Sequence, residues 1–411
     1  MEVLYSLGAM ILFTVGAVYL QPVFWLIIFF VWLQQRRSAK QQRLMFGLSG
    51  FQVWRHTLRA LLLGSAGGIL ASLVIALIGI DLGRLGLAYI WPVAIALLLI
   101  DLRLLCFAYA GGLIALCHLI TGWPDVDVAQ LVALVAVLHL TEGLLIYASG
   151  QDSFLPVLVQ GKNGIVGGFS LLNFWPLPLA LLLAVPLQET QVLSGTLAMP
   201  AWWPVFPAAL APPEQLTYLL LPVVAALGYG DLALVCPPEE RGRRAAAQLV
   251  LYSVSLLALA LLSLKWPVFA WPAALLAPLG HEGMVQWQMR RELKGEARYA
   301  PAQRGVLILD VVPGSLASRA GLRREDVILA VDDLSLHSRD DFFLALTLSA
   351  QWPQELLILR EGRVFSIRQT WSSDLTALGL LLVPNRPVGA YLTLAQSSLL
   401  NKAWNWLQRK F

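Results

Sequence analysis

Residues 304–333 read RGVLILDVVPGSLASRAGLRREDVILAVDD. This stretch contains two runs rich in β-branched and aliphatic side chains, Gly305–Val312 and Asp326–Val331, and such runs predict β-strands. A Pro-Gly turn follows the first run, and a short helix is expected over residues 317–320. Gly321 ends that helix, because glycine readily adopts the left-handed backbone conformation at a helix C-terminus. The stretch therefore predicts a strand, a turn, a short helix and a second strand in close succession.

The sequence after this stretch completes a small α+β domain. Ser338 and Asp341 have the spacing of a helix N-terminal cap, and a helix with an apolar face is predicted from that point. Two further strands are predicted at Glu355–Arg360 and Arg363–Gln369, joined by a Glu-Gly hairpin turn. The predicted domain covers residues 295–371.

The pattern of this domain resembles the bacterial PDZ family, in which a strand is followed by PGS-A-AGL--GD-I-AV-G. Two positions depart from that pattern, because Glu325 and Asp333 stand where the family has glycine. Aspartate tolerates the turn conformations that such glycines adopt, so the fold is expected to be unaffected. The resemblance implies a domain that binds an extended segment of a partner protein.

The resemblance also implies where the partner binds. In PDZ domains the partner's C-terminus adds as a strand to a sheet edge, and backbone N–H groups of the preceding loop hold its carboxylate. By the resemblance the edge strand is Gly305–Val312, the loop is Pro301–Arg304 and the facing helix is Asp341–Ala350. Arg304 either adds charge to the carboxylate site or is only solvated, and the two interpretations stay open. The candidate peptide-binding residues are Gln303, Arg304, Gly305, Val306, Leu307, Ile308, Phe343 and Leu346.

Outside this domain the chain is very apolar. It is 58% hydrophobic and only 13% charged, with a mean hydropathy of +0.69, whereas soluble domains carry about 25% charged residues. Residues 290–368 hold 23 of the 54 charged residues. Lipid is therefore the expected solvent for most of the chain. The basic residues flank apolar runs and form no continuous stripe, so no nucleic-acid partner is expected.

The apolar runs predict a polytopic α-helical membrane bundle of about eight or nine segments, because a spanning helix needs about 20 apolar residues. Gln21-Pro22 breaks the first run, and Lys265-Trp266-Pro267 breaks the last. Gly64 and Gly68 have the spacing of a close contact between two helices. The predicted segments are Val3–Leu33, Leu58–Ile80, Leu85–Ile100, Leu104–Gly122, Val128–Tyr147, Phe174–Leu187, Leu216–Val235 and Leu249–Leu279.

Lysine and arginine indicate which loops face the cytoplasm. They cluster within residues 34–57, at 241–244 and at 290–294, whereas 121–127 and 188–213 contain neither. Counting passes from a cytoplasmic first loop places all of these segments on the expected sides and the PDZ-like domain in the cytoplasm. The predicted organisation is an N-terminal membrane part (1–33), a basic cytoplasmic loop (34–57), the transmembrane bundle (58–287), the PDZ domain (295–371) and a C-terminal tail at the membrane surface (372–411).

One motif invites an enzymatic interpretation. Residues 228–231, Gly-Tyr-Gly-Asp, are similar to the GxGD motif of presenilin-type aspartyl proteases. Those enzymes need a second aspartate, because two carboxylates share the proton that activates water. The catalytic candidates of this alternative are therefore Asp231 and Asp101, the other acid near a predicted span. The favoured interpretation is that Asp231 caps a helix break and that the protein is not an enzyme.

A second motif, His281-Glu282, lies directly before the PDZ-like domain. A zinc protease needs His-Glu-x-x-His, so that two imidazoles share one helix face, but position 285 is Val285. This excludes the zinc protease motif. No metal and no cofactor are predicted, and the pair is expected to lie at a polar helix end.

Other polar and sulfur-containing residues also fall within predicted spans. His139 and Glu142 share one helical face, and hydrogen bonding between helices, with His118 as a partner, is favoured over a metal or proton role. Cys106 and Cys117 are predicted on one helix, about 16 Å apart at the helical rise, so they cannot form a disulfide with each other. They are interpreted as small apolar side chains that fill space.

Short motifs along nearly the whole chain resemble the MinJ family, topological determinants of cell division in Firmicutes. They are LQPVFWLII (20–28), HLTEGLLIY (139–147), GGFSLLNFWPLP (167–178), LGYGDLA (227–233) and LGHEG (279–283), followed by the PDZ domain. The resemblance implies a plasma-membrane scaffold at cell poles and division sites. It also implies a bridge between the curvature-sensing coiled-coil protein DivIVA and the MinC–MinD division inhibitor. The alternative that stays open is a PDZ-bearing GxGD-type intramembrane protease.

Overall fold

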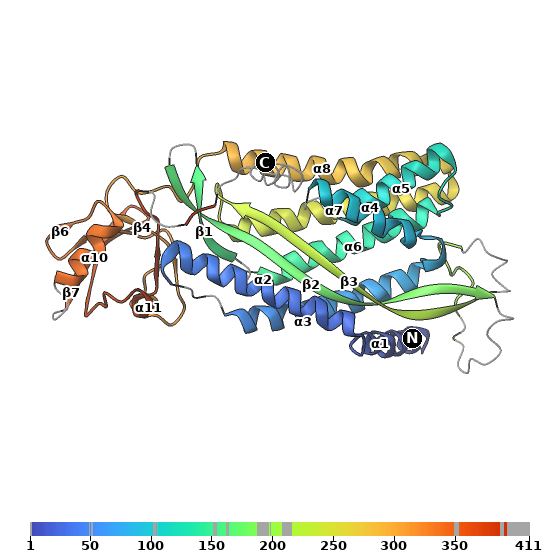
Figure 1. The fold of residues 1–411 in the computed structure, drawn as a ribbon, viewed down its shortest axis with the longest axis horizontal. Coiled ribbons are helices and arrows are strands. Elements are labelled where there is room, and N and C mark those ends of the chain that lie inside the picture. The colour runs from blue at the N-terminus through green and yellow to red at the C-terminus, as the bar shows by residue number, and fades with distance from the viewer. Residues whose placement is uncertain are drawn as a thin grey trace, which may run out of the picture.

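The computed structural model consists of an elongated body and a smaller domain at one end (Figure 1). The body contains the helices α1 to α8 and a long β-hairpin, and the smaller domain begins after α8. The structure describes residues 2–48, 50, 52–101, 104, 106–150, 154–161, 164–186, 197, 199–207, 216–348, 353–386 and 390–392.

The helices of the body follow most of the apolar runs. The predicted break at Gln21-Pro22 is confirmed as a 72° bend between α1 and α2, because proline favours the first turn of a new helix. The predicted break at Trp266 is also confirmed, as a short 3-10 helix (Pro267–Phe269) between α7 and α8. The helices are α1 (Glu2–Val18), α2 (Pro22–Phe46), α3 (Val53–Ile78), α4 (Leu87–Ile100), α5 (Phe107–Thr121), α6 (Val128–Ser149), α7 (Pro238–Lys265) and α8 (Ala270–Lys294).

Fewer helices can cross a membrane than the sequence predicts. Among the described residues, three helices, α3, α6 and α7, are long and apolar enough to do so, and the bent pair α1–α2 raises the number to four if it counts as one span. Helices α4 and α5 have only 14 and 15 residues. The expectation of about eight or nine helical spans of about 20 residues is therefore wrong.

Two of the predicted membrane helices are β-strands. Strand β2 (Gly164–Pro186) covers the predicted helix at 174–187, and β3 (Leu216–Ala233) covers the one at 216–235. The two pair antiparallel along their whole common length, and β1 (Phe154–Gly161) pairs with the start of β2. Every side chain of β2 from residue 175 to 182 is buried. The alternation that identifies a half-exposed strand is therefore missing, and such a long apolar run is easily taken for a helix.

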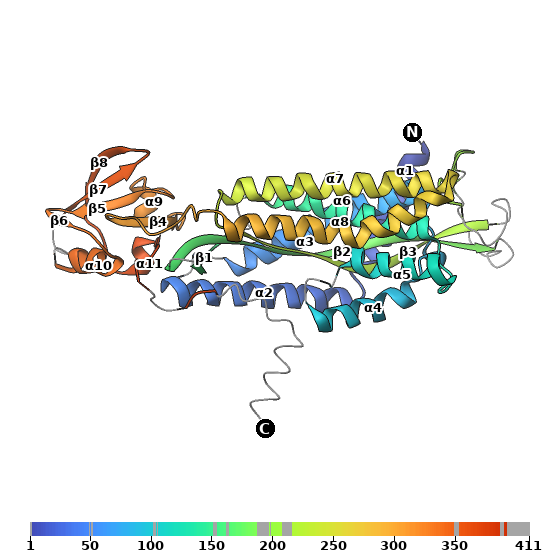
Figure 2. The same cartoon turned by 90° about the horizontal axis from the view of Figure 1, so that it is seen from above.

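The β2–β3 hairpin runs along the body, with α2 on one side and α7 and α8 on the other (Figures 1 and 2). The most buried helix of the body, α6, packs in one core with the odd-numbered side chains of β2, which include Trp175, Leu177 and Leu179. Helix α1 packs against the even-numbered ones, Ala180 and Leu182. Strand β2 is thus internal to the body, whereas most residues of β3 are half-buried.

The edge of β2 that faces away from β3 carries no orphaned N–H group between residues 176 and 186. The even-numbered residues share this edge, because backbone groups alternate between the two sides of a strand. Positions 176, 178 and 186 are proline, which has no N–H. The N–H of Ala180 donates to Ser72 Oγ and that of Ala184 to Asp81 Oδ1, both at 2.8 Å. Leu182 forms a β-bridge with Asp81. This edge can therefore lie in apolar surroundings without water.

Helix α3 approaches this edge closely because of its glycines. A Cβ atom on Gly64 would lie 2.2 Å from the carbonyl oxygen of Pro176, and one on Gly68 would lie 2.3 Å from that of Pro178. The close contact predicted from the Gly64 and Gly68 spacing is therefore present. Its partner is a strand, however, and the expected helix–helix contact is wrong.

The smaller domain contains the elements that the PDZ resemblance predicts. The predicted strands, the short helix and the capped helix are confirmed within a residue or two of their expected bounds. The elements are β4 (Val306–Val311), α9 (Leu316–Arg319), β5 (Val327–Val331), β6 (Leu334–Ser335), α10 (Arg339–Leu348), β7 (Gln354–Arg360), β8 (Arg363–Gln369), α11 (Leu375–Leu378) and β9 (Leu380–Leu382). The strand order is β8-β7-β5-β4-β9, with β6 paired to β5. The sheet thus extends past residue 371, the boundary expected from the sequence.

Strand β9 also joins the PDZ domain to the body. Leu380 and Leu382 pack in the core of the domain. Leu381 and Val383 pack in a second core that includes Phe169 of β2 and the end of α2. Because successive side chains of a strand point to opposite faces, this short strand contributes to both cores.

The basic segments gather at the end of the body that carries the PDZ domain. The end of α2, the start of α7 and the end of α8 all lie there (Figure 1). Direct contacts confirm this placement: Arg339 of α10 donates to the carbonyl of Phe46 at 3.3 Å, and Arg324 pairs with Glu239 of α7 at 2.8 Å. One end of the molecule therefore carries the PDZ domain and all three basic segments.

Candidate functional site

The strand that was predicted to accept a partner is not at a sheet edge. Strand β4 pairs with β5 through residues 306–307 and with β9 through residues 308–311. A strand with neighbours on both sides has no free row of backbone groups for a peptide. The assignment of Gly305–Val312 as the groove-edge strand is therefore wrong.

The predicted peptide-binding residues lie in separate environments. Val306, Ile308 and Leu346 are buried in the core of the PDZ domain, and Leu307 is buried in the core shared with the body. Phe343 is half-buried on α10, under the guanidinium of Arg339. Gly305 has φ +84° and packs against the Ile328 carbonyl, while Gln303 and Arg304 line a shallow pocket of about 560 Å³ with Ala302, Val327, Leu329 and Leu359. The structure does not bring these residues into one groove.

The terminal strand on that side of the sheet is β9, whose three residues are at most 2% exposed. The strand order makes β8 and β9 the terminal strands. Leu380 and Leu382 of β9 share a core with Leu346 of α10. Two leucines of α10, Leu344 and Leu348, are 60% and 70% exposed and lie one turn apart. Strand β9 is therefore covered, whereas α10 offers an exposed apolar surface. Sequence patterns do not indicate β9, because this strand has only three residues.

Local hydrogen bonds position α10 as the sequence predicts. Ser338 Oγ accepts from the N–H of Asp341 at 3.2 Å, and Asp341 Oδ2 accepts from the N–H of His337 at 3.0 Å. The hydrogen bonds from His337 and Ser338 hold the pKa of Asp341 below its ordinary value. The helix therefore begins at a charged cap.

The two departures from the family's glycines have different outcomes. Glu325 adopts the left-handed backbone conformation, with φ +73°, and its carboxylate accepts two hydrogen bonds from Arg298 at 2.8 Å. At the second turn the positive φ, +50°, falls on Asp332 and not on Asp333. Glu325 and Asp332 therefore maintain the turns of the PDZ fold, although neither is glycine.

Asp231 is part of a charged network that differs from a protease dyad. It lies on β3, so the expected helix break at this residue is wrong. Its Oδ2 lies 2.6 Å from Arg241 Nη2 and accepts from the Tyr229 hydroxyl at 2.8 Å. Asp101, by contrast, follows α4, which lies in the half of the body far from the PDZ domain (Figures 1 and 2). A carboxylate paired with a guanidinium does not share a proton with a second carboxylate, so this geometry disfavours the aspartyl protease.

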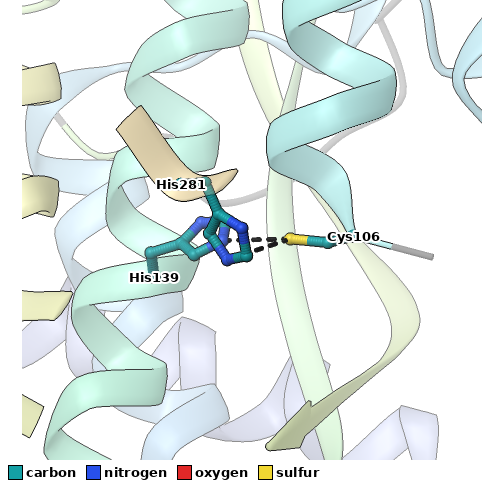
Figure 3. Close-up of side chains that lie close together, drawn as sticks. All are labelled: Cys106, His139 and His281. Atoms are coloured by element: carbon teal, nitrogen blue, oxygen red, sulfur yellow. Dashed lines mark hydrogen bonds between the residues drawn. The ribbon is translucent and has the colours of Figure 1, made fainter. Parts of the chain in front are cut away.

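The structure brings together three residues that the sequence analysis kept apart. Cys106 precedes α5, His139 lies on α6 and His281 lies in the middle of α8, and their side chains converge (Figure 3). The expected partner of His139, His118, instead contacts the Pro124 carbonyl at 2.8 Å. The position of His281 within α8 also corrects the expected helix end. No spacing in the sequence could have indicated this cluster, because each residue comes from a different helix region.

Comparison with known families identifies the smaller domain. Residues 307–346 match the PDZ domain family. The match runs from β4 through most of α10, so it contains the strands and the capped helix of the predicted PDZ domain. The PDZ resemblance of this part of the chain is confirmed.

The chain as a whole is similar to a characterised bacterial protein. It is 24% identical over 399 residues to the cell division topological determinant MinJ of Bacillus subtilis (strain 168), and the match covers 92% of this chain and 96% of that protein. The match therefore includes the body as well as the PDZ domain. The MinJ-like character predicted from short motifs is confirmed.

Proposed function

We propose that this chain is a non-enzymatic membrane scaffold of the cell-division machinery, which recruits cytoplasmic proteins through its PDZ domain. The observation that carries this proposal is the similarity to a cell-division determinant along nearly the whole chain, together with the PDZ match. A PDZ domain is a peptide-recognition module, and the paired Asp231 argues against the aspartyl protease alternative.

The proposed orientation places the PDZ end of the molecule in the cytoplasm. All three basic segments lie at that end, and basic residues mark the cytoplasmic side of membrane proteins. The three candidate spans and the hairpin would then cross the membrane along the long axis of the body. The segments 121–127 and 188–213, which lack lysine and arginine, would lie outside.

Partner binding is proposed at the exposed surface of α10. Apolar side chains of the partner would contact the exposed leucines Leu344 and Leu348. The proposed partners are the DivIVA and MinD homologues of the same cell. By recruiting both, the scaffold would select the division site at poles and septa.

The test replaces the exposed leucines of α10 in the full-length protein, as the double substitution Leu344→Ser and Leu348→Ser. Both side chains are mostly exposed, so the domain should still fold. Binding of purified DivIVA and MinD homologues to the protein in nanodiscs is measured, together with their localisation in cells. We expect at least a tenfold loss of binding to one of them and its dispersal from the division site.

The matched control is Arg304→Glu, which changes an exposed residue in the shallow pocket lined by the β5 side chains Val327 and Leu329. It should leave binding and localisation unchanged. If the control abolishes binding and the leucine variant does not, the partner binds at the pocket. If neither variant changes recruitment, the PDZ domain does not recruit these proteins and the proposal fails.

A further inference from the structure

The side chains of Cys106, His139 and His281 form a compact cluster inside the body (Figure 3). Cys106 Sγ lies 3.1 Å from His139 Nε2 and 3.9 Å from His281 Nε2, and the three ligand atoms all lie within 4.8 Å of one another. His139 is only 2% exposed, and the other two residues are half-buried. Among the described residues this is the group of histidine, cysteine and acidic side chains that is close enough to hold one metal ion.

Neighbouring groups orient both imidazole rings. His139 Nδ1 lies 2.8 Å from the Val135 carbonyl oxygen, which can only accept, so Nδ1 carries the proton. His281 Nδ1 lies 3.2 Å from the Tyr109 hydroxyl, and that hydroxyl donates to Glu282 Oε2 at 2.5 Å. The Tyr109 oxygen is therefore left to accept from His281 Nδ1–H.

The consequence is that both Nε2 atoms present a lone pair toward Cys106. Metal-binding histidines in proteins usually donate their other N–H to a carbonyl or carboxylate, which fixes the tautomer and the ring orientation. His139 does so directly, and His281 does so through Tyr109 to Glu282. The second shell of a metal site is thus present around the three ligand atoms.

The distances suit zinc. Zinc–sulfur and zinc–nitrogen bonds of about 2.3 and 2.1 Å at a tetrahedral angle place sulfur and nitrogen ligands about 3.6 Å apart. The two observed sulfur–nitrogen distances, 3.1 and 3.9 Å, lie on either side of this value. We infer that Cys106, His139 and His281 bind a Zn²⁺ ion, with Cys106 as thiolate and one coordination position left for a further ligand such as water.

The proposed ion would tie three helical segments together. Its ligands come from the start of α5, the middle of α6 and the middle of α8. Glu282, the neighbouring carboxylate, already accepts from Tyr109 and from Gln286 Nε2, so it supports the site and is not directed at the ion as a catalytic base. The site is therefore assigned a structural role, independent of partner binding at the PDZ domain.

The test measures zinc in the purified full-length protein in detergent, by mass spectrometry after a wash with a weak chelator. Wild type should hold close to one zinc per chain, and Cys106→Ser and His139→Gln should each lose it. The matched control is Cys117→Ser, which lies on α5 outside the cluster and should keep its zinc. Three outcomes would overturn the assignment. They are zinc that is retained in Cys106→Ser, wild-type protein without zinc, and wild-type protein isolated with copper.

A second measurement holds even if the ligand variants fail to fold. Wild-type protein stripped of metal and reloaded with Co²⁺ should show the absorption of a thiolate–cobalt bond, and its absence would contradict the role of Cys106. Tyr109→Phe keeps all three ligands and removes only the hydroxyl next to His281. It should weaken zinc binding about 10- to 100-fold. An unchanged affinity would show that the second shell does not act as inferred.

Discussion

The two sheets of the molecule show opposite burial patterns. In β7 of the PDZ domain the side chains from Gln354 to Ile358 alternate between buried and exposed. In β2 of the body every side chain from residue 175 to 182 is buried. Alternation is the signature of a strand with water on one face, so it disappears when both faces are covered by apolar groups. This is why sequence patterns identified the strands of the PDZ domain but not β2.

The same difference appears at the sheet edges. A strand edge in water can bond to solvent, whereas one in apolar surroundings needs partners for each backbone group. The outer edge of β2 meets this requirement in three ways. Three of its residues are prolines, which have no N–H, two N–H groups donate to side-chain acceptors on or near α3, and one residue forms a β-bridge. Substitutions that open this edge should therefore destabilise the protein more than comparable substitutions in the PDZ domain.

The largest effect is expected from Gly68→Ala in α3. The new Cβ would lie 2.3 Å from the Pro178 carbonyl oxygen, so helix and strand must separate. Overpacking of this kind should cost about 3 kcal/mol of folding free energy. Thermal unfolding of the full-length protein in detergent measures the loss. The control is Gly16→Ala in α1, where a Cβ meets nothing within 4 Å, and equal behaviour of the two variants would contradict the close packing.

The next largest effect is expected from Ser72→Ala. This change leaves the N–H of Ala180 buried without its acceptor, which should cost about 2 kcal/mol. The measurement is again thermal unfolding. Ser255→Ala on α7 serves as control, because Ser255 is half-buried and its hydroxyl donates to a carbonyl of its own helix. If the two serine variants have the same melting temperature, the β2 edge does not depend on this acceptor.

A smaller effect is expected in the PDZ domain from Arg360→Gln. Arg360 donates two hydrogen bonds of 2.6 Å to the buried carboxylate of Asp326, but a quarter of its own side chain is in water. Water can replace part of the lost hydrogen bonding, so the expected loss of folding free energy is about 1.5 kcal/mol. Urea unfolding of the full-length protein in detergent provides the measurement. Arg363→Gln, an exposed change in the same hairpin, should have no effect.

The smallest effect concerns pH. The pKa of Asp341 is lowered in the folded domain, so its cap contributes stability above the ordinary pKa of aspartate and loses it as pH falls through the folded value. Asp341→Asn should therefore narrow the difference in stability between neutral and acidic solution. Melting temperatures of both proteins across that range test this, and an identical pH profile would show that the cap does not titrate.

Much of the architecture follows from sequence patterns alone. The turns, capped helix and hairpin of the PDZ domain depend on residues a few positions apart. Sequence patterns can therefore predict these features without knowledge of the tertiary structure. The breaks at Gln21-Pro22 and Trp266 have the same origin. Even the two misassigned segments run along the body as predicted, β2 away from the PDZ end and β3 back toward it (Figure 1). The directions of these two segments are therefore right although their secondary structure is wrong.

Other features are decided only by the tertiary structure. Whether residues 174–186 form a helix or a strand depends on α3, whose glycines, Ser72 and nearby Asp81 receive the strand edge. Strand β9 pairs with β4 and so occupies the edge that the sequence predicted as the binding site of the partner. Cys106 and His281 are 175 residues apart and meet only because α5, α6 and α8 pack together. Local sequence specifies backbone propensity, whereas these contacts arise from the burial of distant segments against each other, which no local pattern encodes.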